Sequence, residues 1–152
     1  MKWLEPCYRL QRLAWKHLRP RTRGVKVMLF DAGGRILLIR NAYGRSDLFV
    51  LPGGGVRPWE RLERAAAREI REELGCGVDR LALVSVHASI AEGKRDTIHL
   101  FTGLAVGEPV ADGVELAEAA FFPLDALPEA TSPATQRRIA EWLEKRAVDG
   151  SW

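Results

Sequence analysis

The segment PGGGVRPWERLERAAAREIREELGC, residues 52–76, decides how the chain is interpreted. Three glycines follow a proline, and a run rich in glutamate and arginine then continues to Gly75. A glycine directly after a helical run is the commonest C-terminal cap of a helix. We therefore predict a glycine-rich loop followed by a helix over 60–74.

Three carboxylates share one side of the predicted helix. At about 100° per residue, Glu69, Glu72 and Glu73 fall within roughly 100° of one another. An adjacent apolar stripe anchors the helix in a core and consists of Leu62, Ala66, Ile70 and Leu74. Carboxylates fixed so close together repel, and protons or hard cations relieve that repulsion. Oxygen ligands suit Mg²⁺ or Mn²⁺, and these ions suit phosphates.

A purely structural interpretation of the same helix must be weighed. Ion pairs such as Arg68 with Glu72, or Glu69 with Arg64 or Arg71, are typical of a solvated helix face. The arrangement of the residues favours the functional interpretation. Gly54, Glu60 and the run REIREELGC over 68–76 stand at the spacing of the Nudix box, so the segment resembles the signature of the Nudix (MutT-like) hydrolases. Two positions depart from the usual pattern, because Cys76 replaces a bulky aliphatic residue and Trp59 replaces a common glycine.

The resemblance implies a fold and an activity. Nudix hydrolases have an α/β/α sandwich, in which helices enclose a mixed β-sheet. They hydrolyse pyrophosphate bonds in nucleoside diphosphates linked to another moiety, and they use Mg²⁺ or Mn²⁺. This chain is accordingly expected to act on a small-molecule nucleotide or nucleotide derivative, by attack of water on phosphorus.

The resemblance also implies roles for individual residues. Glu69, Glu72 and Glu73 match the metal ligands, and either Glu69 or Glu72 matches the base that activates water. Arg68 and Glu60 match a supporting pair, and the carbonyl of Gly53 matches a further metal ligand.

A further carboxylate is expected from a loop before the last strand. Glu115 stands at a matching place, with Glu118 and Asp112 as alternatives. An exposed loop acid with no such role is the competing interpretation of Glu115.

The rest of the chain predicts one α+β domain. Apolar runs at 25–30 and 35–40 flank Asp31-Ala32-Gly33-Gly34 and indicate a hairpin. Further strands are expected at 48–51, 81–90, 97–106 and 119–122, with a helical turn at 124–127. Ser132-Pro133 predicts the start of a helix that continues to about residue 146. We divide the chain into a basic N-terminal segment, 1–22, and a Nudix domain, 23–148.

The net charge of +3 is unevenly distributed. Residues 1–26 contain eight basic residues and one acidic residue, whereas the remaining residues contain 15 basic and 19 acidic residues. An amphipathic basic helix is expected over 8–18, and docking on the domain is favoured over nucleic-acid binding, because such patterns are weakly specific. Removal of pyrophosphate from RNA 5′ ends, or a non-catalytic nucleotide- or nucleic-acid-binding module, are the alternative functions.

Several residues outside the acidic helix are candidates for substrate contact. Trp59 and Phe49 have rings that stack on bases, and Arg95 has a guanidinium that binds phosphate. Asp96 and His99, near the same turn into a strand, are further candidates for contact with the base or phosphate. Phe49 is also a typical core residue, and Arg95 a typical exposed turn residue.

Two cysteines, Cys7 and Cys76, are too few for a disulfide framework. No apolar run has the length of a membrane span or the pattern of a signal peptide, so we expect a cytoplasmic protein without a membrane partner. The sequence does not indicate an oligomeric state.

Overall fold

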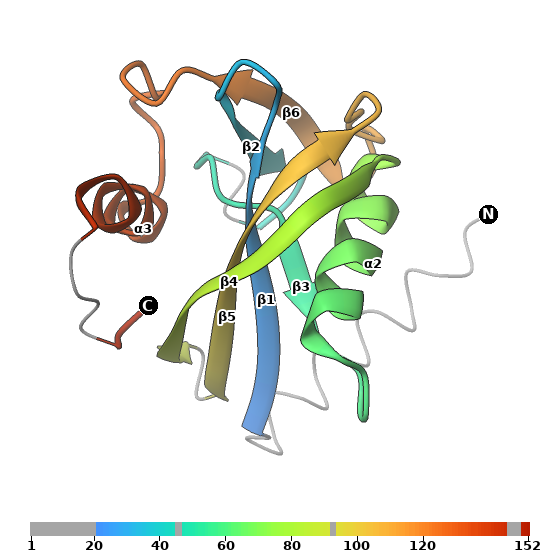
Figure 1. The fold of residues 1–152 in the computed structure, drawn as a ribbon, viewed down its shortest axis with the longest axis vertical. Coiled ribbons are helices and arrows are strands. Elements are labelled where there is room, and N and C mark those ends of the chain that lie inside the picture. The colour runs from blue at the N-terminus through green and yellow to red at the C-terminus, as the bar shows by residue number, and fades with distance from the viewer. Residues whose placement is uncertain (1–20, 45–46, 92–93, 146–149) are drawn as a thin grey trace.

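The computed structural model describes residues 21–44, 47–91, 94–145 and 150–152. A six-stranded sheet lies between two helices (Figure 1). The strands are β1 (Arg21–Phe30), β2 (Ile36–Asn41), β3 (Gly53–Gly55), β4 (Gly77–Ala91), β5 (Lys94–Val106) and β6 (Leu116–Phe122). The helices are α2 (Leu62–Leu74) and α3 (Pro133–Glu144). The predicted helix over 8–18 and Cys7 lie outside the described residues.

The sheet is mixed, as predicted. Its strand order is β4-β5-β1-β2-β6, and β3 pairs with β1 alongside this path. Strands β1 and β5 run parallel, and the other neighbouring strands are antiparallel. Strand β1 therefore lies at the centre, in contact with β5, β2 and β3.

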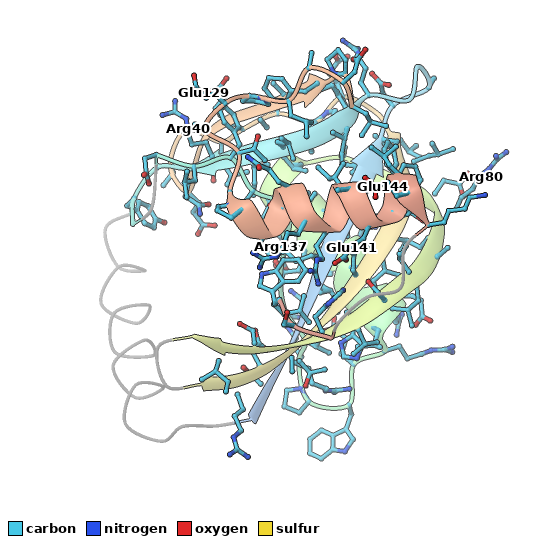
Figure 2. All side chains as sticks on the ribbon, turned by 90° about the vertical axis from the view of Figure 1, so that its left-hand side faces the viewer. Arg40, Arg80, Glu129, Arg137, Glu141 and Glu144 are labelled. Carbon is cyan, nitrogen blue, oxygen red and sulfur yellow. The ribbon has the colours of Figure 1, made fainter. Side chains whose placement is uncertain are left out.

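Strand β1 contributes side chains to both faces of the sheet, because successive residues of a strand point to opposite sides. Val25, Val27 and Leu29 belong to a core cluster with α2 residues. Met28 and Phe30 belong to a second cluster that includes Ile139 and Trp142 of α3, and the rings of Phe30 and Trp142 are centred 4.9 Å apart. The two helices thus cover opposite faces, which confirms the expected α/β/α sandwich, and Figure 2 shows α3 lying across its face.

Three local predictions are confirmed. The hairpin joins β1 to β2, and Asp31 accepts hydrogen bonds from the backbone of Gly33 and Arg35. Gly75 caps α2 in the left-handed conformation. Ser132 caps α3, where its hydroxyl accepts a hydrogen bond from the backbone of Thr135.

The strand predicted at 48–51 is wrong in detail. Phe49 and Val50 form only isolated bridges, whereas the three glycines after Pro52 form strand β3. The reason is that β1 provides a paired backbone, with Gly24 opposite Gly55 and Lys26 opposite Gly53. Pairing with β1 thus overrides the low strand propensity of glycine.

Strand β1 begins at Arg21, four residues before the run from which it was predicted, because its pairing with β5 continues to this residue. The turn predicted at 124–127 is present, and the backbone N–H of Ala126 donates to the carbonyl of Pro123 at 3.1 Å. In the described part of the chain, no helix has the length and apolarity needed to cross a bilayer.

Candidate active site

Strand β3 lies against the acidic side of α2. A side chain at Gly53, whose φ is +151°, would place its Cβ 2.0 Å from the carbonyl oxygen of Val25. A Cβ at Gly54 would lie 2.4 Å from the carboxyl carbon of Glu69. Both positions therefore need glycine, and the absence of side chains brings the β3 backbone into contact with the α2 carboxylates.

Arg68 connects the helix to the loop that precedes it. Its Nε and one terminal nitrogen donate to the two carboxylate oxygens of Glu60, at 2.8 and 2.9 Å. The same terminal nitrogen donates to the carbonyl of Gly55 at 2.8 Å. The other terminal nitrogen donates to Glu69 at 2.8 Å and to Glu72 at 3.1 Å. The predicted supporting pair of Arg68 and Glu60 is thus present as a bidentate ion pair.

Glu60 is held as a carboxylate. The hydrogen bonds from Arg68 lower its pKa to about 2, and a backbone hydrogen bond from Arg57 acts in the same direction. Glu60 therefore remains charged over the physiological pH range and serves as an anchor.

The surroundings of Glu69 and Glu73 disfavour the ionised form of these two carboxyl groups. Burial raises the pKa of Glu69, against the opposing effect of Arg68, and the neighbouring charge of Glu72 raises it further. Burial raises the pKa of Glu73 to about 7, although Lys26 and a hydrogen bond from the backbone of Gly53 oppose the shift. The protein's own cations therefore do not fully compensate these two carboxylates.

Glu72 differs from the other two carboxylates, because half of its side chain is exposed. One oxygen accepts from Arg68, and the other pairs with Arg57 at 3.5 Å. An exposed ion pair of this kind is worth about 0–1 kcal/mol, so Glu72 can change partners at little cost.

The carboxylates of Glu69, Glu72 and Glu73 suit a hard cation in their chemistry. The contacts of these carboxylates described above are all with donor groups of the protein. Within the described residues, no three acidic, histidine or cysteine side chains lie close enough together to hold an ion in their present positions. Two of the three carboxylates have pKa values raised by burial, so a divalent cation would relieve an existing electrostatic cost. The chemistry of these carboxylates therefore fits a divalent metal ion.

The loop before β6 brings a fourth carboxylate toward α2. Glu115 is exposed, and its charge raises the pKa of Glu73. The two alternatives have other partners. Asp112 accepts three backbone hydrogen bonds within its own loop, and Glu118 pairs with Arg40 at 3.2 Å.

The predicted substrate contacts lie in different places. Trp59 is 97% exposed and follows Pro58, which lines a groove beside β3. Phe49 packs against Phe122 in the core on the α3 side, with ring centres 5.4 Å apart. Arg95 is exposed on β5, on the sheet face opposite Asp96, because side chains alternate along a strand.

The departures at Cys76 and Trp59 have different outcomes. Cys76 is buried in the α2-side core, where it packs as a small apolar residue. Trp59 has a φ of +59°, in the region that glycine adopts without strain. The loop therefore keeps a glycine-like conformation although the residue is tryptophan.

Lys26 was not identified from the sequence as a site residue. Its amine donates to the carbonyl of Leu51 at 3.0 Å, and it lowers the pKa of Glu73 and of Glu69. Burial lowers its own pKa, and the neighbouring carboxylates oppose that shift. The signal in the sequence is a lysine inside the strand VKVMLF, where the alternating residues on both faces are otherwise apolar.

These observations define an α/β/α sandwich that carries an acidic helix beside a glycine strand. The model of the NUDIX domain matches residues 20–143, and the chain belongs to this family as a Nudix hydrolase. A protein of Bacillus subtilis named "Putative 8-oxo-dGTP diphosphatase" is 35% identical over 124 residues, which cover 80% of this chain and 79% of that protein.

Two further relatives show the breadth of the similarity. An isopentenyl-diphosphate Delta-isomerase of Streptomyces griseus is 37% identical over 120 residues, which cover 70% of this chain and 59% of that protein. The crystal structure of a MutT NUDIX hydrolase from Burkholderia pseudomallei superposes with a TM-score of 0.70 at 30% identity, covering 80% of this chain and 97% of that chain.

The raised pKa of Glu73 predicts a pH-dependent stability in metal-free buffer. Because the folded state binds the proton more tightly than the unfolded state, the contribution of Glu73 to stability is complete below pH 4.5 and is lost as the pH rises through about 7. At pH 8, Glu73→Gln should increase the free energy of unfolding by about 1–3 kcal/mol. Urea denaturation in EDTA measures the effect, and the exposed Glu63→Gln on the same helix is the control. Equal stability of wild type and Glu73→Gln at pH 8 would contradict the assignment.

The backbone of Trp59 predicts a stabilising substitution. A non-glycine residue in the left-handed region costs about 1–2 kcal/mol, and the greater freedom of glycine in the unfolded chain offsets part of the gain. Trp59→Gly should therefore increase the free energy of unfolding by about 0.5–1 kcal/mol, whereas Trp59→Ala, which keeps Cβ, should not. Urea midpoints compare the two variants, and an equal gain in both would show that loss of the exposed ring, not backbone strain, is responsible.

Proposed function

We propose that the chain is a metal-dependent hydrolase that cleaves a pyrophosphate bond in a nucleoside diphosphate linked to another moiety. The observation that carries the proposal is the group of three carboxylates on α2 beside a backbone without side chains. Arg68 holds Glu69 and Glu72, and burial leaves Glu69 and Glu73 incompletely neutralised. Both curated relatives described above have a diphosphate or diphosphatase in their names, which agrees with a substrate that contains a phosphoanhydride.

Mg²⁺ or Mn²⁺ is the cofactor that we assign to these carboxylates, with the Gly53 carbonyl and Glu115 as further ligands. When bound, such an ion lowers the pKa of water and neutralises charge on phosphate oxygens. The remaining steps belong to side chains of the protein. Glu69 or Glu72 accepts the proton of the attacking water, and Arg68 keeps the carboxylates oriented through its contacts with Glu60 and Gly55.

The electrostatics give the two candidate bases different properties. The side chain of Glu69 is only 14% exposed and its pKa is raised, whereas Glu72 is half exposed and exchanges its partners easily. A base with a pKa nearer to neutrality is the better proton acceptor at neutral pH. We therefore favour Glu69 as the base, with Glu72 as a ligand.

Removing one charge at a time tests the proposal. Glu69→Gln and Glu72→Gln should each lower Mg²⁺-dependent phosphate release by at least about 100-fold, the usual contribution of a positioned acid or base. The exposed Glu63→Gln on the same helix should retain the wild-type rate. Circular dichroism checks that the fold is intact. Near wild-type rates in both Glu69→Gln and Glu72→Gln would refute the assignment.

The basic N-terminal segment allows a test of the RNA alternative. Nucleoside triphosphates, nucleotide sugars, ADP-ribose, dinucleoside polyphosphates and triphosphorylated RNA are assayed with full-length protein and with a deletion of residues 1–20, which leaves β1 complete. If the segment serves only as a docked helix, the deletion leaves all rates within about two-fold, a difference of less than about 0.5 kcal/mol. A loss confined to RNA would instead assign the segment to RNA binding. Salt-sensitive nucleic-acid binding without any Mg²⁺-dependent hydrolysis would favour the non-catalytic module.

A further inference from the structure

Strand β4 forms one edge of the sheet, and a short segment from the C-terminal part of the chain pairs with that edge (Figure 1). The N–H of Ala88 donates to the carbonyl of Gly150 at 2.8 Å, and the N–H of Trp152 donates to the carbonyl of Ala88 at 3.1 Å. Residues 150–152, which we call the strap, thus run parallel to β4 and engage both backbone groups of Ala88.

A buried arginine of α3 holds the strap through side-chain contacts. Arg138, whose side chain is fully buried, donates to the carbonyl of Ser151 and to a ring nitrogen of His87. Its guanidinium carbon lies 5.8 Å from the ring centre of Trp152, and the ring centre of His87 lies 5.7 Å from that of the same indole. The indole also packs against the α3-side core. The strap therefore occupies a site that β4 and α3 build together.

Arg138 depends on the strap because its charge has few other partners. A buried charge is costly unless hydrogen-bonded partners compensate it. Among the described residues, Glu141 is the only carboxylate that pairs with Arg138, at 2.9 Å, and the Nε of Arg138 has no hydrogen-bond partner. The carbonyl of Ser151 thus supplies an acceptor to a guanidinium that the core leaves incompletely paired.

The edge of β4 continues on both sides of the contact with the strap. Residues two apart in a strand direct their backbone groups to the same side, so Val86 and Ile90 direct theirs outward like Ala88. The side chains of Val86 and Ile90 are 44% and 82% exposed, and they share the α2 face of the sheet, because Val86 lies opposite His99 and His99 opposite Val25. An open strand edge flanked by exposed apolar side chains is a template for pairing with another chain.

We propose that the edge of β4 is a surface for self-association and that the strap blocks it. The occupant is a second copy of this chain, whose β4 pairs antiparallel about a two-fold axis at Ala88. Such an axis places Val86 of one copy opposite Ile90 of the other, so the exposed apolar side chains meet and the surface is self-complementary. Pairing of two β4 strands and docking of the strap use the same backbone groups of Ala88, so they exclude one another. This inference is independent of the hydrolytic activity.

Removing the indole of the strap tests the proposal. Trp152→Ala should detach the strap and lower the dissociation constant of the homodimer at least about tenfold relative to the wild type. Sedimentation and light scattering over a range of protein concentrations measure this constant, and circular dichroism checks the fold. Trp59→Ala, which removes a 97% exposed indole elsewhere, should leave the constant unchanged.

Deletion of residues 150–152 is the second variant, and it should give the same dissociation constant as Trp152→Ala, because both variants free the edge. A wild type that dimerises as tightly as the two variants would show that the strap does not block association. Folded variants that remain as monomeric as the wild type would show that the free edge does not associate. Either result overturns the proposal.

A charge on the exposed face tests whether β4 forms the dimer interface. In the Trp152→Ala background, Ile90→Lys should restore the dissociation constant of the wild type, because two lysines would enter an apolar contact. Val110→Lys is the matched control, since Val110 is 64% exposed but bonds to Leu74 at the opposite end of the sheet. It should leave the Trp152→Ala dimer intact. A dimer that persists with Ile90→Lys, or that Val110→Lys abolishes equally, overturns the assignment to β4.

Discussion

The guanidinium of Arg68 is the contact on which the site depends. An arginine has five N–H groups, and those of Arg68 make five hydrogen bonds, to Glu60, Gly55, Glu69 and Glu72. Glu60 belongs to the loop, Gly55 to β3, and the other two partners to α2. One permanently charged group thereby fixes three segments relative to one another. A lysine could not replace it, because an ammonium has three donors and no planar fork.

The same contact leaves the site electrostatically incomplete. Glu60 takes two of the five hydrogen bonds and is fully compensated, so its pKa falls to about 2. Glu69 receives one hydrogen bond from Arg68, and burial still raises its pKa. Glu73 depends on the backbone of Gly53 and on Lys26. Better ion pairing of Glu69 and Glu73 would have stabilised the fold. Because that pairing is incomplete, a bound cation would relieve the remaining electrostatic cost, a common compromise at functional sites.

Locally encoded elements were predictable from the sequence, and those fixed by distant pairing were not. Helix α2, its Gly75 cap and the Ser132 cap of α3 depend on residues within one or two turns. Strand β3 could not be found this way, because glycines lack strand propensity and the β1 backbone supplies their partner. The early start of β1 likewise depends on β5, more than 70 residues away in the sequence.

The same distinction between local and distant interactions decides which site residues could be predicted. The carboxylates and Arg68 lie in one short segment with a distinctive spacing, so the sequence identified them together. Lys26 was missed because it comes close to Glu73 only through the pairing of β1 with β3, which places Lys26 opposite Gly53. The sequence offered both Arg95 and Asp96 as candidate substrate contacts, and strand alternation places Asp96, not Arg95, in the groove beside β3. The sequence pattern identifies suitable types of residue. Which of two adjacent residues in a strand can meet a ligand depends on the face of the sheet to which each side chain points.

Glycines occupy the part of the sheet that lies between the acidic helix and the groove beside β3. Gly54 faces Glu69 on the α2 side, and Gly24 lies under Asp96 on the other side. Gly55 pairs with Gly24, so the strip of sheet between the two carboxylates has no side chains. The main chain of this strip is therefore open to close approach by other groups. Any side chain at Gly54 would displace Glu69, so the openness of this strip and the position of that carboxylate depend on the same residue.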